Sequence, residues 1–303
     1  MDTGRSEDKP VTEFNISVPW GHIRVKAWGS ADNPHVLVFH GLADNAGSFD
    51  NLMPYLSNSF YYLCMELPGH GKSSHFPSNL PIHTTDYIIV YKLIAEHFKQ
   101  KKYIIVSHSL GAQIAMMFAR VYPDYVEKLI GLELIPPVLP DAKRSIKYVK
   151  SRLELFENIA SRGPASYSYD EALESFSKNR YADEVLTKEA AEPILKRCLQ
   201  QQDNGRYIFT TDERIKAYIN PLHDMRYEIE SFKSDPLKCP TLIILSKLND
   251  RPRKKYRDLI SKWQACNNIT ITYVDGHHDI HNNNPRRVAP YINKFLLAHQ
   301  SKL

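Results

Sequence analysis

Ser109 lies where a short apolar run, residues 104–106, meets a helix-like stretch at residues 112–122. A serine in a sharp strand-to-helix turn exposes its hydroxyl as a nucleophile, and the turn requires small residues two positions before and after it. Ser107 and Gly111 meet this requirement, although Gly is the usual residue at the first position. The pattern predicts a serine nucleophile that attacks a carbonyl carbon.

A second group suited to that chemistry lies upstream, where His40-Gly41-Leu42 follows the apolar run at residues 35–39. Attack on a carbonyl creates an oxyanion, which backbone N–H groups stabilise. We expect the N–H groups of Leu42 and Leu110 to form this oxyanion hole, with His40 and Gly41 shaping the loop.

Three histidines follow the last apolar run, in the sequence Gly276-His277-His278-Asp279-Ile280-His281. Imidazole takes and returns a proton near neutral pH, so this loop is the expected source of the base that activates Ser109.

The elements that would position these groups are short apolar runs separated by helical stretches. Residues 12–29 alternate apolar and polar side chains around Pro19-Trp20-Gly21, which predicts a hairpin of two antiparallel strands. The later runs lack polar alternation, which is typical of parallel strands that are covered on both faces; they are residues 35–39, 61–65, 103–106, 129–134, 241–245 and 269–274. The expected fold is therefore α/β, with a mostly parallel central sheet and helices on both faces.

The alternation of apolar runs and helical stretches stops at residues 136–236, which contain no convincing strand pattern. Ile146, Val149, Leu153 and Phe156 share one helical face, and Ser168-x-x-Glu171 reads as a capping box at the start of another helix. A third helix is expected around residues 193–199. We interpret residues 136–236 as a helical cap inserted into a core formed by residues 1–135 and 237–303.

Several motifs together resemble the kraken-type serine hydrolase-like branch of the α/β-hydrolases. They are Pro19-Trp20-Gly21, His40-Gly41, Pro68-Gly69-His70-Gly71, the turn around Ser109 and the G-x-H-x-x-H-x-x-x-P pattern that starts at Gly276. The similarity covers most of the chain outside the insertion. It implies an α/β-hydrolase fold and a Ser-His-acid triad in which His278 is the base, while His277 and His281 are structural or surface histidines.

Two carboxylates are candidates for the acid of that triad. Asp250 follows the strand at residues 241–245, where such proteins commonly carry the acid, but it comes one residue later than the usual spacing. Glu133 ends the strand before the insertion, and a carboxylate beside a buried apolar run needs a reason to be there. We favour Asp250, with Glu133 as the alternative.

Composition limits the partners. A net charge of +5 with scattered basic residues does not indicate nucleic acid binding. Four separated cysteines suggest neither a metal site nor a disulfide framework, and no cofactor is expected.

The sequence has no secretion signal and no apolar run long enough for a membrane span. Its final residues, Ser301, Lys302 and Leu303, match the tripeptide read by the peroxisomal import receptor, so we expect a peroxisomal protein, or otherwise a cytoplasmic one.

The expected function is hydrolysis of a carboxylic ester through an acyl-enzyme intermediate. An acyl-CoA thioesterase is the first alternative, motivated by the C-terminal tripeptide and by the basic residues between 251 and 257. A small-molecule acyl ester or thioester would be the substrate. The second alternative is a binding protein that keeps the fold without turnover, since Ser107 and the uncertain acid depart from the usual pattern.

Overall fold

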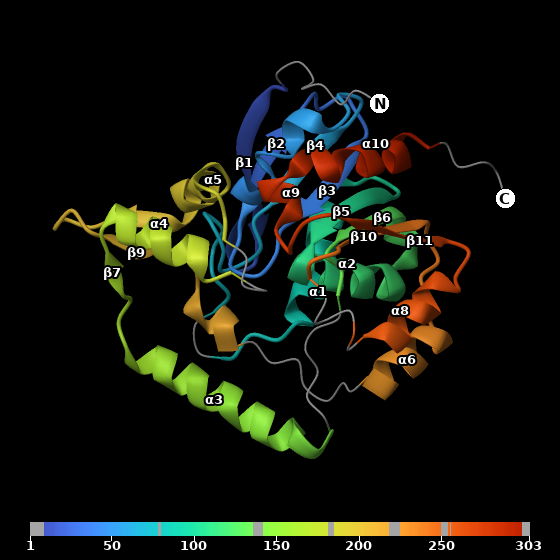
Figure 1. Cartoon of the computed structure of the whole chain (residues 1–303). Coiled ribbons are helices and arrows are strands. Elements are labelled where there is room, and N and C mark those ends of the chain that lie inside the picture. Colours follow the sequence, from blue (N-terminus) through green and yellow to red (C-terminus); the bar gives the residue numbers. More distant parts are fainter. Residues whose placement is uncertain are drawn as a thin grey trace.

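The computed structural model describes residues 9–77, 80–135, 142–180, 185–217, 225–249, 254 and 256–298. An eight-stranded sheet runs through the centre of the molecule in the order β1-β2-β4-β3-β5-β6-β10-β11 (Figure 1). The strands are β1 (Val11–Val18), β2 (Gly21–Trp28), β3 (His35–Phe39), β4 (Tyr61–Met65), β5 (Tyr103–His108), β6 (Val126–Leu132), β10 (Thr241–Ser246) and β11 (Ile269–Val274).

The sheet begins with the predicted hairpin and continues as a parallel sheet. Strands β1 and β2 pair antiparallel around Gly21, whose φ of 142° is accessible to glycine and strained for other residues. Strand β2 also pairs antiparallel with β4, whereas the pairs from β4 to β11 are all parallel. Parallel strands direct their carboxyl ends to one edge, so the loops that follow β3, β5, β6, β10 and β11 meet there.

Helices cover both faces of the sheet, which confirms the predicted α/β class (Figure 1). One face packs against α1 (Asp86–Phe98), α2 (Ser109–Val121), α6 (Met225–Ser234) and α8 (Arg257–Gln264). The other face packs against the 3₁₀ turns η1 (Ala46–Phe49) and η2 (Met53–Tyr55) and against α9 (Ile280–Asn283) and α10 (Ala289–Leu297). Further 3₁₀ turns are η3 (Pro123–Tyr125), η4 (Ala142–Arg144), η6 (Glu213–Ala217) and η7 (Pro285–Arg287).

Between β6 and β10 the chain forms the three expected helices. They are α3 (Ser145–Ser161), α4 (Tyr169–Lys178) and α5 (Lys188–Cys198), and α4 begins at the capping box of Ser168 and Glu171. The prediction that this stretch has no strand was wrong. Strands β7 (Ser166–Tyr167), β8 (Leu199–Gln201) and β9 (Tyr207–Phe209) form a separate antiparallel sheet in the order β7-β9-β8. Two or three residues are too few to show an alternating pattern, so these strands could not be predicted from periodicity.

Helix α5 connects this stretch to the core through hydrogen bonds. The side chain of Asn45 donates a hydrogen bond to the carbonyl of Ile194 (2.9 Å), and Asn282 donates one to the carbonyl of Ala190 (3.0 Å). Helix α6 also falls within residues 136–236, yet it packs beside α8, and Arg120 of α2 donates to the carbonyl of Ser231 (2.6 Å). Part of the stretch therefore covers the central sheet itself.

Some predictions concern residues outside the described ranges. Asp250, most of the basic residues between 251 and 257, and Ser301, Lys302 and Leu303 are among them. Within the described ranges, no helix has both the length and the apolar character needed to cross a bilayer.

Candidate active site

Ser109 is the first residue of α2, directly after β5, and its φ is 50°. This left-handed conformation is unfavourable for a residue with a Cβ and marks a strained turn. Gly111 makes the turn possible, because a Cβ there would lie 2.5 Å from the carbonyl oxygen of His40. Ser107 is accommodated because its hydroxyl donates a hydrogen bond to the carbonyl of Ile130 on β6 (3.3 Å). The turn therefore tolerates serine where glycine is usual.

His278 follows β11 and reaches the serine across the carboxyl edge of the sheet. Its Nε2 lies 2.9 Å from Oγ of Ser109, within hydrogen-bond reach. The His278 side chain is 8% exposed, so solvent screens this contact little. The two residues are 169 positions apart in the sequence, and the parallel strand order brings them together.

Glu133 lies on the opposite side of the His278 ring. It follows β6 in a left-handed turn with φ 51°, and its Oε2 is 3.4 Å from Nδ1 of His278. The backbone N–H of Ser246, at the end of β10, donates to Oε1 of Glu133. A carboxylate beside Nδ1 favours the tautomer with the proton there, which leaves Nε2 free to accept the proton of Ser109.

Asn249 is a site residue that the sequence reasoning missed. It is buried, its amide Nδ2 donates to Oε2 of Glu133 (2.7 Å), and the same nitrogen lies 3.4 Å from Nδ1 of His278. Because a carboxylate only accepts hydrogen bonds, this contact fixes the orientation of the amide. The spacing could have identified it, since Asn249 stands one residue before Asp250, where the usual spacing places the acid.

The charge state of His278 reflects these neighbours. Burial favours the neutral ring, but the hydrogen bond to Glu133 and the negative charges of Asp279 and Glu133 outweigh it, so the pKa of His278 is raised above its ordinary value. The imidazolium that forms when the ring takes up a proton is thereby stabilised.

The expected oxyanion groups flank the serine. Leu110 is the second residue of α2, where a backbone N–H has no partner within its own helix. Gly41 lies against the serine, because a Cβ at this position would come 3.2 Å from Cβ of Ser109. The loop that continues into Leu42 therefore passes beside Ser109.

His40 holds that loop through hydrogen bonds of its ring. Its Nδ1 hydrogen bonds the carbonyl of Gly41 (2.7 Å), and its Nε2 accepts from the N–H of Leu67 (3.0 Å). A carbonyl only accepts, so the proton is on Nδ1 and the ring is neutral. Burial, more than any other influence, lowers the pKa of His40 to about 4. His40 thus joins the loops after β3 and β4 as a structural residue.

The remaining histidines of the base loop differ in position. His277 is exposed, whereas His281 is fully buried, with its ring 4.1 Å from that of His108 and 5.1 Å from that of Phe49. Burial moves the pKa of His281 well below its ordinary value, so this ring packs as a neutral group.

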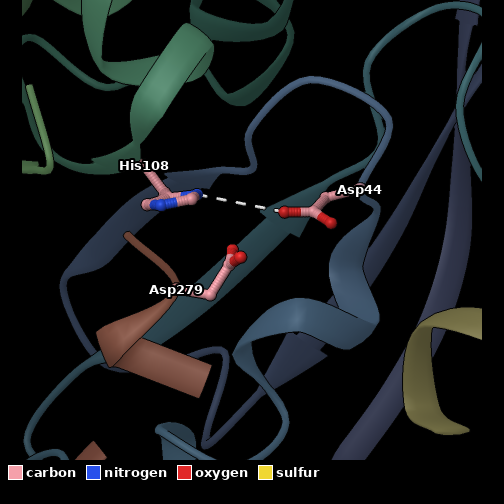
Figure 2. A group of neighbouring side chains, drawn as sticks. All are labelled: Asp44, His108 and Asp279. Carbon is pink, nitrogen blue, oxygen red and sulfur yellow. Dashed lines mark ion pairs between the residues drawn. The ribbon is translucent and has the colours of Figure 1, made fainter. Parts of the chain in front are cut away.

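Behind the base loop lies a buried charged cluster, which we name the Arg180 cluster and define as Asp44, His108, Asp279 and Arg180. Figure 2 shows the first three, which approach one another from the loop after β3, the end of β5 and the loop before α9. One ligand atom of each lies within 4.8 Å of the others, a spacing that would suit a metal ion. The guanidinium of Arg180 already bonds both carboxylates, at 2.9 Å to Asp44 and 2.7 Å to Asp279, so the cluster has its own cation.

Comparisons with known proteins identify the family of this chain. The family model described as "alpha/beta hydrolase fold" matches residues 34–285. A serine hydrolase-like protein of Danio rerio is 30% identical over 297 residues, which cover 95% of this chain and 89% of the relative.

Solved structures show the same fold. A hypothetical protein from Pseudomonas aeruginosa PAO1 superposes with a TM-score of 0.80 at 23% identity, covering 94% of this chain and 97% of its own. The thioesterase domain from the curacin biosynthetic pathway gives a TM-score of 0.75 at 19% identity, covering 95% and 100%. With 252 of its 303 residues matched by the family model, from 34 to 285, the chain belongs to the α/β-hydrolase fold family, among the serine hydrolase-like proteins.

Proposed function

We propose that this protein hydrolyses a carboxylic ester, with Ser109 as nucleophile, His278 as base and Glu133 as the acid that orients it. The observation that carries the proposal is the distance of 2.9 Å between Nε2 of His278 and Oγ of Ser109, with Glu133 on the far side of the ring. A nucleophile, a base and a group that orients the base, aligned in this order, are the parts that acyl transfer requires.

In the proposed reaction, His278 Nε2 takes the hydroxyl proton while Oγ of Ser109 bonds to the carbonyl carbon. The N–H groups of Leu42 and Leu110 would stabilise the oxyanion. His278 then gives its proton to the departing alkoxide, which leaves an acyl-enzyme. Water attacks this ester by the same route, releasing the carboxylic acid and restoring Ser109.

The choice of Glu133 over Asp250 rests on contacts in the described part of the chain. Glu133 is 1% exposed, and its carboxylate accepts from Ser246 and Asn249 while it faces His278. Burying a carboxylate is costly, and here each of its oxygens has a partner. Asp250 lies outside the described residues, so its exclusion depends on the variants discussed below.

Covalent labelling with a fluorophosphonate tests this proposal, because the reagent reacts with an activated serine. Wild-type protein should be labelled, and Ser109→Ala should lose the label while keeping its thermal unfolding transition. Ser107→Ala serves as a matched control, because its hydroxyl bonds the carbonyl of Ile130 and not the site. Undiminished labelling of Ser109→Ala would refute the nucleophile, and an unlabelled wild type would favour the binding-protein alternative.

A second experiment distinguishes carboxylic esters from acyl-CoA thioesters as the substrate class. We place the ester first, and the thioester alternative depends on sequence features that lie largely outside the described residues. Helices α3, α4 and α5 with the β7-β9-β8 sheet would form the cap that selects the acyl group, since α6 packs on the central sheet. Turnover of p-nitrophenyl esters of increasing chain length should be compared with turnover of acyl-CoAs by the same preparation. Faster hydrolysis of acyl-CoAs at equal chain length would replace the ester proposal by the thioesterase.

Peroxisomal residence is a proposal from the sequence alone. A fluorescent protein fused to the N-terminus should give puncta that coincide with a peroxisomal marker, and deletion of Leu303 should make the signal diffuse. Diffuse fluorescence with the tail intact would refute both the compartment and the import receptor as a partner.

A further inference from the structure

Arg180 lies just after α4, in the stretch between β6 and β10, yet its guanidinium is buried in the central domain. Its side chain is 8% exposed, and it contacts two carboxylates that come from two different loops. Nη1 lies 2.9 Å from Oδ1 of Asp44, while Nη2 and Nε donate to Asp279 at 2.7 and 3.0 Å. A guanidinium presents its donors in a fixed planar fork, so it holds both carboxylates in one geometry.

Those two loops carry two parts of the proposed machinery. Asp44 is two residues after Leu42, whose N–H is the expected oxyanion donor, and Asp279 directly follows the base, His278. A contact that fixes Asp44 and Asp279 relative to each other therefore fixes the oxyanion loop relative to the base.

We propose that Arg180 is a positioning residue for the hydrolysis, because it joins the loop of Leu42 to the loop of His278. This inference rests on the proposed function and adds a requirement to it: the stretch between β6 and β10 must be docked for the site to be complete. Asn45 strengthens the case, since the residue after Asp44 holds α5 through the carbonyl of Ile194 (2.9 Å).

The nucleophile turn contributes a second tie to the base loop. Nε2 of His108 hydrogen bonds the carbonyl oxygen of His278 (3.0 Å), so this nitrogen carries the proton, because a carbonyl only accepts. Burial, followed by the charge of His278, lowers the pKa of His108 to about 4, so the ring is neutral. Arg180 is then the cation that faces the two aspartates in the Arg180 cluster.

Charge gives Arg180 a second effect on the base. Its positive charge lowers the pKa of His278, opposing the carboxylates that raise it. The titratable groups that face His278 come from several elements; they are Glu133, His108, Arg180, Asp279 and His281. Loss of Arg180 would leave Asp44 and Asp279 without their shared cation, so the pKa of His278 should rise.

The experiment measures the rate constant of fluorophosphonate labelling against pH for wild type, Arg180→Met and Arg180→Lys. Labelling requires neutral His278, so the rate falls as pH drops through the pKa of this residue. Arg180→Met should label at least about tenfold more slowly at its optimum. The acid limb of its plot of labelling rate against pH should move up by about one pH unit, because fewer positive charges oppose the imidazolium.

Arg180→Lys separates charge from geometry. The ammonium keeps the positive charge but cannot bond two carboxylates as a planar fork, so the acid limb should stay near that of wild type while the rate falls. Arg206→Met is the matched control, because Arg206 lies in the same stretch, is 44% exposed in its side chain, and has Ser166 and Glu171 (3.0 Å) as its partners. This control should label like wild type.

The outcomes distinguish the two proposals. Absence of Ser109-dependent labelling in wild type would overturn the hydrolase and this inference together. A labelled wild type with Arg180→Met within twofold of its rate, and with the same acid limb, would overturn only the positioning role. If Arg180→Met shows no cooperative thermal unfolding, Arg180→Lys decides, and a wild-type rate in this variant would refute the proposal.

Discussion

Glu66 and Glu133 are two buried glutamates that follow strands of the same sheet, and their surroundings differ. Glu66 comes after β4 and is 0% exposed; Glu133 comes after β6 and is 1% exposed. Oε1 of Glu66 lies 2.5 Å from Nε of Arg197, and its Oε2 accepts from the N–H of Lys72 (2.7 Å). The partners of Glu133 among the described residues are a backbone N–H, the amide of Asn249 and the His278 ring.

This difference separates a structural carboxylate from a functional one. The guanidinium of Arg197 places a positive charge against Glu66 and also against Glu13, and it ties α5 to the central sheet. The amide donors around Glu133 hold its oxygens without cancelling its charge, so that charge remains available to His278. Our proposal that Glu133 is the acid therefore rests on the kind of partner and not on burial.

Replacing Glu133 by Gln should have the largest effect on the reaction. The uncharged amide neither fixes the His278 tautomer nor stabilises the imidazolium, so the labelling rate should fall by about 10³-fold or more. Thermal unfolding, measured in parallel, should remain cooperative. Asp250→Asn is the matched control and should keep the wild-type rate; the reverse result would make Asp250 the acid and contradict the comparison.

Replacing Asn249 by Ala should have a smaller effect of the same kind. Glu133 keeps its charge and the N–H of Ser246 but loses one charge-assisted hydrogen bond, so its carboxylate is less well aligned with the ring. One such bond contributes about 1.5–3 kcal/mol, which corresponds to a rate loss of about tenfold to a hundredfold. A wild-type rate in Asn249→Ala would mean that Glu133 is aligned without the amide.

The pH dependence of the wild type should show the charge of Glu133 directly. The pKa of His278 is raised, so the ring is protonated and inactive as a base up to a higher pH than an ordinary histidine, whose pKa is about 6.5. The acid limb of kcat/KM should therefore have its midpoint above this value. In Glu133→Gln the residual activity should have a lower midpoint, because the carboxylate no longer stabilises the imidazolium. An unmoved midpoint would count against Glu133.

Replacing Glu66 by Gln should have the smallest effect on the reaction and act on stability instead. Arg197 loses its buried partner but keeps its ion pair with Glu13 (2.6 Å), so the free energy of unfolding should fall by less than the about 3–5 kcal/mol that an unpaired buried charge costs. Denaturant unfolding measures this loss, and the labelling rate of the folded protein should match wild type. The double variant Glu66→Gln/Arg197→Met should have a higher free energy of unfolding than Glu66→Gln alone. A large loss of labelling rate at full folding would remove the distinction between the two glutamates.

Local patterns in the sequence determined the strands, the hairpin and the nucleophile turn. Ser107, Ser109 and Gly111 encode a turn through their size alone, and each apolar run encodes a covered strand. Of the four helices described between β6 and β10, α3, α4 and α5 were likewise predicted from periodicity and a capping box. The short strands β7, β8 and β9 were not, because they are stabilised by pairing with one another and not by an alternating pattern of their own.

The tertiary structure alone decided which groups surround His278. Glu133, Asn249 and the base follow β6, β10 and β11, and only the strand order places these three loops at adjacent positions of one edge. Arg180, just after α4, reaches the loops that follow β3 and β11, 136 positions after Asp44 and 99 positions before Asp279. Contacts at such separations depend on sheet order and helix docking, which no local spacing encodes.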